Sequence, residues 1–459
     1  MAASSPLGDL LAALGMSGDR FARRLNALAE EFEREERVHV KTPYKWSRGE
    51  TPRSPWRALS ALLLSRELGR TITPADLGWP ADQVEYTTAT CGLDSPWTRE
   101  GTLRALAVVA DADRMDRRSF VALVGTAITS PAHEWLIAHP ITRLAQATGT
   151  AIPAGVVDHL DGITDHLRRM DDQVGGGPML RLVHEQLRYV TTLLRNGRYD
   201  DSLGRRLHAV AAELLRLAGF AAFDSGRHGL AQWYWDAGLR AAHAAGDSAL
   251  GANILGFKSC QAKDAGGGRE AVVLANSARL GYSGASGQVT AILALRAAEA
   301  AANDRTTTSG HRASQTRHAI DDAFNALDDP PPATGHPAWA YWMDPAQAHA
   351  QAGYCYLRIG EHAKARTELR AALRLQDKEY SREGALRHVL LATTYLQQTQ
   401  PDLEHTLAHA HQAADALTGH VDSARCRGHL DRLAKDLQPY RRTTKVQELL
   451  DRSRAMSNP

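Results

Sequence analysis

The chain has 459 residues, which is enough for two to four domains or for one long solenoid. Its formal net charge is only +2, which excludes a polycation, so nucleic-acid binding would have to come from a local patch. The four cysteines lie far apart and form no CxxC pair, which argues against a disulfide scaffold and against a cysteine-based structural zinc site.

Alanine and leucine dominate the sequence, β-branched residues are sparse, and glycines often end the periodic runs, a combination typical of an all-α protein. The N-terminal segment lacks the basic and apolar regions of a signal peptide. No run of about 18 apolar residues occurs that could cross a membrane. We therefore expect an all-α, soluble, cytoplasmic protein without a membrane partner.

Residues 1–80 are predicted to form a unit of four short helices. The first helix carries leucines at i, i+3, i+4 and i+7 from Leu7 and ends at Gly15. Ser17 is expected to cap the second helix, because its hydroxyl can accept a bond from a first-turn N–H. A later helix opens at Pro55. Four short helices in this length suit a helix-turn-helix bundle.

The third helix of this unit is the one on which the functional prediction depends. Thr42 is expected to be its N-cap, with a proline at the first helical position, and Gly49 is expected to lie just past its end. At 100° per residue, Tyr44 and Arg48 fall opposite Trp46. If Trp46 is buried, a short basic face points outward, which suits the major groove of DNA.

Charge is concentrated around this helix. Six lysines or arginines lie between Arg37 and Arg57, against the single acid Glu50, and an acidic run from Glu30 to Glu36 precedes them. We expect base contacts from Tyr44, Lys45, Ser47 and Arg48, and phosphate or backbone contacts from Lys41, Thr42, Arg53 and Arg57. The alternative is that these are ordinary solvated side chains of a small helical domain.

The N-terminal unit resembles the Xre/Cro-type helix-turn-helix of bacterial repressors. The resemblance lies in the Trp-x-x-Gly pattern Trp46-Ser47-Arg48-Gly49 and in the segment GRTITPADLG at 69–78, which is similar to the end of that domain in actinobacterial, Streptomyces-type regulators with tetratricopeptide-like repeats. The sequence departs from that pattern in the loop 34–40, which is longer than in compact repressors. This departure affects how the helix would dock.

Residues 81–200 are predicted to be a helical linker region. The sequence HEWLI at 133–137 lacks the second histidine of a zinc-protease motif, and the triple glycine at 175–177 lacks the lysine of a phosphate loop. We read the glycines as a helix–helix turn. No nucleophile with a base, paired carboxylates or metal cluster occurs at a usable spacing, so we expect no enzyme activity, no cofactor and no metal.

Residues 201–440 carry a repeated pattern of small and large residues. The clearest unit runs from Gly353 through Leu369 to Ala372, and Gly219 with Trp235 begins an earlier copy at the same spacing. The alanines of the second helices recur every 40 to 48 residues, longer than the roughly 34-residue tetratricopeptide repeat. We therefore predict a tetratricopeptide-like α-solenoid with a concave inner surface, followed by a tail at 441–459.

The segment 211–247 is similar to the repeat part of the same actinobacterial regulators. More distantly, the repeats resemble the peptide-sensing domains of Gram-positive quorum regulators, in which asparagines of the inner helices hold a peptide backbone. That resemblance points to Asn253 and Asn276 as ligand-binding residues. Trp233 and Trp342 are candidates for a ligand pocket, since aromatic side chains often line one. The competing interpretation is that all four are ordinary solenoid positions and that Trp235 belongs to the core.

Together these features predict a transcriptional regulator that binds double-stranded DNA through its N-terminal unit. The repeat domain would form a homodimer and sense an effector, which is a small molecule, a peptide or a protein. The alternative is a tetratricopeptide-type adaptor whose helix-turn-helix does not bind DNA. The near-neutral net charge keeps that alternative open.

Overall fold

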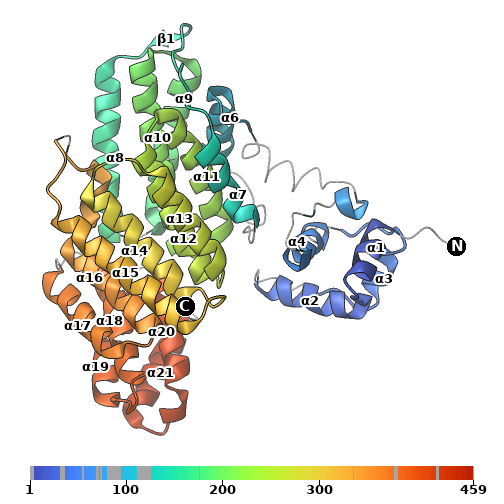
Figure 1. Cartoon of the computed structure of the whole chain (residues 1–459), viewed down its shortest axis with the longest axis vertical. Coiled ribbons are helices and arrows are strands. Elements are labelled where there is room, and N and C mark those ends of the chain that lie inside the picture. Colours follow the sequence, from blue (N-terminus) through green and yellow to red (C-terminus); the bar gives the residue numbers. More distant parts are fainter. Residues whose placement is uncertain are drawn as a thin grey trace.

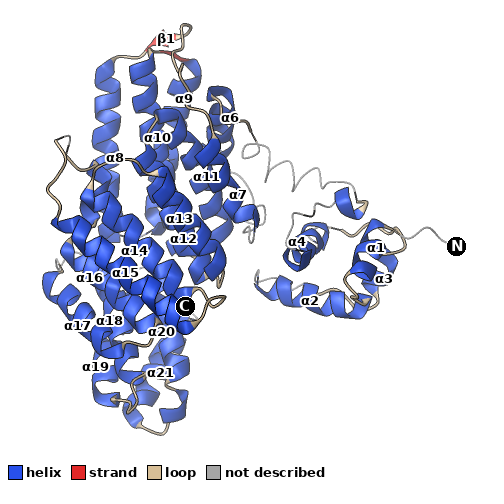
Figure 2. Ribbon diagram, viewed as in Figure 1, coloured by secondary structure: helices blue, strands red, loops and turns tan. Residues whose placement is uncertain are grey.

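The computed structural model describes residues 5–31, 37–53, 56–68, 72, 75–79, 95–110, 126–174, 176–333, 335–376, 381–419 and 423–457. These residues are almost entirely helical (Figure 2), which confirms the all-α prediction. The two short strands β1 (Thr150–Ala151) and β2 (Gly197–Arg198) pair in parallel. The side chains of the acidic run 30–36, which precedes the basic residues, lie outside what the structure describes.

The N-terminal unit comprises α1 (Pro6–Ala13), α2 (Gly18–Glu31), α3 (Thr42–Trp46), α4 (Trp56–Leu68) and the 3₁₀ turn η1 (Ala75–Leu77). Gly15 has φ +57°, as a left-handed helix end requires. The Ser17 hydroxyl accepts from the Arg20 N–H at 3.3 Å, which confirms the predicted cap. Leu7, Phe21 and Leu25 lie in a hydrophobic core of this unit's own.

A long helical array follows. Its first four helices are α6 (Arg99–Ala110), α7 (Thr126–Ile137), α8 (Ala154–Val174) and α9 (Gly176–Asn196). They pack on later helices, α6 on α11, α7 on α13, and α9 on α10. One cluster of buried apolar side chains extends from Ala105 to Ala348, and so crosses the boundary that we placed at residue 200.

The array continues as five pairs of helices, in which the two members of a pair pack on each other (Figure 1). The pairs are α10 (Asp201–Asp224) with α11 (His228–Ala245), α12 (Ser248–Asp264) with α13 (Gly268–Gly281), α14 (Gly287–Asn303) with α15 (Ser309–Asp328), α16 (Pro345–Arg358) with α17 (His362–Leu375), and α18 (Ser381–Leu396) with α19 (Leu403–Gly419). A 3₁₀ helix, η4 (Ala338–Trp342), precedes α16. This consecutive packing confirms the solenoid prediction.

The repeat positions read from the sequence lie at the helix contacts. The second-helix alanines are all buried: Ala231, Ala271, Ala319, Ala365 and Ala410. The turn glycines Gly226, Gly266 and Gly360 have φ of +78°, +85° and +83°, a left-handed conformation that glycine adopts without a Cβ clash. Small residues therefore let each pair of helices approach closely.

The array ends with α20 (Ala424–Asp436), η5 (Gln438–Tyr440) and α21 (Thr444–Ser457). The expected tail 441–459 thus contains a helix, and its Val446, Leu449 and Leu450 are buried against α19 and α20. No helix among the described residues is long and apolar enough to span a membrane.

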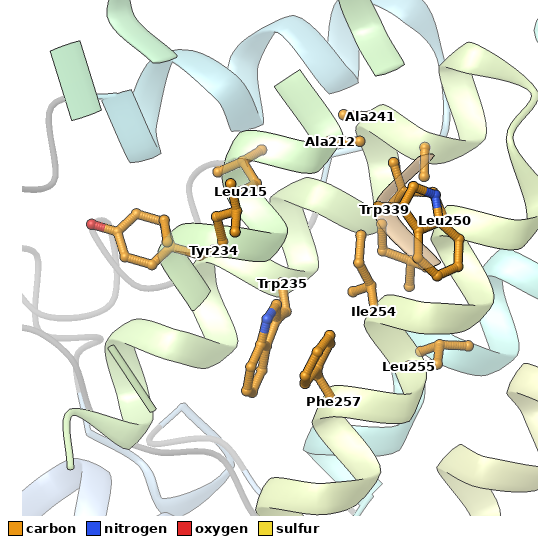
Figure 3. Close-up of a cluster of buried hydrophobic side chains, with 14 of the residues drawn as sticks. Ala212, Leu215, Tyr234, Trp235, Ala241, Leu250, Ile254, Leu255, Phe257 and Trp339 are labelled. Carbon is orange, nitrogen blue, oxygen red and sulfur yellow. The ribbon is translucent and has the colours of Figure 1, made fainter. Parts of the chain in front are cut away.

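Trp235 is buried completely, which confirms its predicted core position. Its ring stacks on Phe257 with centroids 6.1 Å apart and an interplanar angle of 13°. Figure 3 shows the two rings facing each other, while the neighbouring Tyr234 points in another direction. The ring of Phe257 also lies near the ring of Trp342, with centroids 6.4 Å apart. Three aromatic rings from α11, α12 and η4 thus neighbour one another.

Candidate nucleic-acid interface and central cavity

Two contacts hold the short helix α3 in place. Trp46 is only 3% exposed and meets Trp79 edge to face, with ring centroids 6.1 Å apart. Before the helix, the Asn26 side chain accepts from the Val38 N–H at 2.8 Å and donates to the Val38 carbonyl at 2.9 Å. Because this two-point bond fixes the chain on α2, the position of α3 is defined although the preceding loop is long. Sequence reasoning missed Asn26.

The face opposite Trp46 points outward, as predicted. Tyr44 is 42% exposed, and Lys45 and Arg48 are exposed beside it. The Tyr44 ring lies against the start of α2, where a Cβ added to Gly18 would be 2.9 Å from its Cε2. Aromatic and basic side chains thus share one outward surface.

The other predicted contact residues fall into two groups. Lys41 and Arg53 are exposed. Thr42, Ser47 and Arg57 are only half-exposed, and two of these side chains already bond to the backbone. The Ser47 hydroxyl donates to the Pro43 carbonyl at 3.0 Å, and Arg57 Nε donates to the Pro52 carbonyl at 2.7 Å.

The predicted N-cap needs a correction. Thr42 is the first residue of α3, and Lys41 is the N-cap, without a side-chain capping bond. The Thr42 N–H donates to the His39 carbonyl at 2.8 Å, in a backbone turn that leads into the helix. The helical segment is also shorter than two turns, and Gly49 closes it with φ +101°.

Four basic side chains of this surface have no carboxylate partner in the described part of the chain. Lys41, Lys45, Arg48 and Arg53 make no ion pair with any residue that the structure describes. In the same unit, by contrast, Arg24 pairs with Glu67 at 2.7 Å and ties α2 to α4. No described carboxylate therefore competes with an external anion, such as a phosphate, for these four cations.

The four predicted ligand residues do not come together. Asn253 and Trp233 are buried inside α12 and α11, and Asn276 is exposed on α13. Of these four residues, only Trp342 lines a polar cavity of the array. A helical wheel gives the angle of a residue on its own helix, but it does not show which neighbouring helix covers that angle.

This cavity, called the central cavity below, has a volume of about 160 Å³. One water molecule needs roughly a tenth of that space. Its wall comes mainly from the first helices of the five pairs: Phe220 on α10, Phe257 on α12, Arg296 on α14, Gln351 on α16 and Arg382 on α18. A second depression, lined by Ile163 and Leu182, lies between α8 and α9.

Seven lysine or arginine side chains, one histidine and four acidic side chains line the central cavity. Most of the cations are paired with carboxylates. Arg296 bonds to Glu299 at 3.1 Å, and Arg382 bonds to Glu383 at 3.1 Å. Arg382 also lies 3.6 Å from Asp171. Burial nonetheless raises the pKa of Asp171 above its ordinary value, against the attraction of that arginine.

Sequence reasoning missed these cavity residues. The available signal was a lone basic residue inside an apolar run, as in ELLRLAG at 213–219 and LALRAAEA at 293–300. Such a residue is costly to bury without a partner, so each one marks a site to inspect.

Residues 7–80 match the family model described as the SP15 N-terminal domain. The matched segment coincides with the N-terminal unit from α1 to η1. No curated protein matches the chain.

Proposed function

We propose that this protein is a transcriptional regulator that binds double-stranded DNA through the surface of α3. One observation carries the proposal: Trp46 is buried, while Lys45 and Arg48 project outward without a carboxylate partner among the described residues. A cation that is not already paired inside the protein can exchange its counterions for DNA phosphates. Tyr44 and Arg48 would face base edges, and Lys41 and Arg53 would contact the backbone.

The size of α3 suggests a homodimer. A helix of five residues reaches only a few base pairs, and two copies on a two-fold related site would double the contacts. In this proposal the array joins the two copies and senses an effector. An effector that prefers one curvature of the array would change the distance between the two α3 surfaces.

A gel shift with the DNA upstream of the protein's own gene tests the proposal. We expect binding at about 50 mM salt that weakens steeply by about 200 mM, as phosphate contacts require. Arg48→Ala should lower the affinity for the specific site far more than the affinity for random DNA. The control Arg305→Ala also removes one positive charge, but from an exposed position in the array. It should change neither the affinity for the specific site nor the affinity for random DNA.

Equal losses on specific and random DNA would contradict the assignment of Arg48 to base contact. Absence of any binding at about 50 mM salt would favour the adaptor function instead, because electrostatic binding is strongest there. The measured mass of the full chain in solution tests the homodimer separately.

A further inference from the structure

Arg216 is a cavity residue whose guanidinium is not bonded to a carboxylate in the described part of the chain. It projects from α10 and is 5% exposed. Its guanidinium makes no hydrogen bond or ion pair with any described residue, and its Nε is buried without a partner. Glu213, one turn earlier on α10, forms an ion pair with Arg168. Burying a cation without a hydrogen-bonded carboxylate is unfavourable, so the position of Arg216 points to a ligand group that pairs with it.

A second arginine lies on the same aromatic ring. The guanidinium carbon of Arg216 is 5.9 Å from the centre of Phe257, and that of Arg296 is 5.4 Å from it. Arg296 also lies 5.9 Å from the ring of Trp342. Two positive charges therefore flank one patch of aromatic surface, and the single Glu299 that pairs with Arg296 is shared with Lys263 at 3.7 Å.

Unsatisfied polar atoms line the same cavity. Gln351 is 5% exposed, and neither its amide nitrogen nor its amide oxygen has a partner among the described residues. The Nε1 of Trp342 is likewise buried and unpartnered within that part of the chain. Leaving such groups unpaired costs about 1–3 kcal/mol each, so these donors and the acceptor indicate a polar occupant.

We propose that the central cavity binds a small organic anion, whose carboxylate or phosphate group pairs with Arg216 and whose planar part lies against Phe257 and Trp342. Gln351 would supply an amide donor and acceptor to the same molecule. This inference depends on the proposed function in one respect, which is that the bound anion would be the effector that the array senses. The binding itself does not require DNA.

Isothermal titration calorimetry of the full chain tests the proposal with four probes: benzoate, phenyl phosphate, inorganic phosphate and benzyl alcohol. We expect binding of benzoate or phenyl phosphate, weaker binding of inorganic phosphate, and no binding of the neutral alcohol. Comparing benzoate with phenyl phosphate distinguishes a carboxylate ligand from a phosphate ligand. Binding as tight for benzyl alcohol as for the anions, or no binding of either aromatic anion, would overturn the proposal.

The variant Arg216→Met replaces the cation with an apolar side chain of similar length. We expect the affinity for the aromatic anion to fall about 10- to 100-fold, as the loss of a charge-assisted hydrogen bond predicts. We also expect the ligand-free variant to melt at a higher temperature than the parent chain, since an unpaired buried charge is removed. Arg305→Met, at an exposed position, should change neither property.

A lower melting temperature of Arg216→Met, with anion binding unchanged, would show that Arg216 is structural and would refute the site. The gel shift keeps this result separate from the proposed function. Arg216→Met should bind DNA as tightly as the parent chain when no effector is present, even though it no longer binds the anion. Arg48→Ala should bind the anion as the parent chain does in calorimetry.

Discussion

Gly353 on α16 lies directly against Leu369 on α17, so closely that a Cβ added to the glycine would be 2.6 Å from Leu369 Cγ. Gly219 on α10 has the same relationship to Trp235 on α11, sixteen residues later in the chain, and the added Cβ would press on the indole ring. In both of these repeat units, the glycine of the first helix thus packs against a large side chain of the second helix.

Gly353→Ala should destabilise the array by about 1–3 kcal/mol, because the new methyl group overfills a packed contact. The midpoint of urea unfolding measures this change. Gly428→Ala is the matched control, since nothing lies within 4 Å of its added Cβ inside α20. Alanine there should stabilise the helix by about 0.5–1 kcal/mol. Equal midpoints for the two variants would contradict the contact as described.

Trp46→Ala should unfold the N-terminal unit while the array stays folded. The indole is buried against Trp79, and truncating a buried tryptophan costs about 3–5 kcal/mol. Amide hydrogen exchange resolved by peptide measures it: peptides from α1 to α4 should lose protection, and peptides from α10 to α19 should keep it. Arg48→Ala, at the exposed face, should leave all of these peptides protected.

Lys258 and Asp236 form an ion pair whose side chains are 0% and 3% exposed. Lys258→Met should cost about 3–5 kcal/mol, because it leaves a buried carboxylate without its partner. The double variant Lys258→Met with Asp236→Leu should recover most of that loss, since it removes both charges together. Denaturant midpoints of the single and double variants test this. A double variant no more stable than the single one would show that the pair fixes the geometry of α11 and α12.

Stability should fall as the pH drops from about 6.5 to about 4. Burial lowers the pKa of His208 to about 4, and its neutral ring bonds through Nδ1 to the Gly204 carbonyl at 2.7 Å. An unfolded histidine titrates near 6.5, so below that pH the unfolded chain binds a proton that the folded chain excludes. The loss reaches about 3 kcal/mol near pH 4.

The pH dependence of His208→Gln isolates this effect. The difference in unfolding free energy between pH 7 and pH 5 should be smaller for His208→Gln than for the parent chain, and unchanged for the exposed His311→Gln. If all three proteins lost stability equally, other groups would account for the acid sensitivity. Burial also lowers the pKa of His388 to about 4 and that of His429 to about 3, so a residual dependence of the same sign is expected in His208→Gln.

The periodicity of the sequence was sufficient to predict those features that depend on a single helix or on two consecutive helices. It predicted the all-α class, the burial of Trp46 with Tyr44 and Arg48 outward, and the repeat glycines and alanines. These succeed because a helix places residues at fixed angles, and because consecutive helices joined by a short turn pack on each other.

Tertiary structure decided everything that needed helices distant in the sequence to meet. Arg216 and Gln351 line one cavity although they lie on α10 and α16, and Asn253, chosen by resemblance, is covered by its neighbours. The Lys41 cap and the Asn26 bond to Val38 likewise depend on chain geometry between elements. The physical reason is the curvature of the array: small tilts between successive pairs, set by side-chain packing, determine which helices enclose the central cavity.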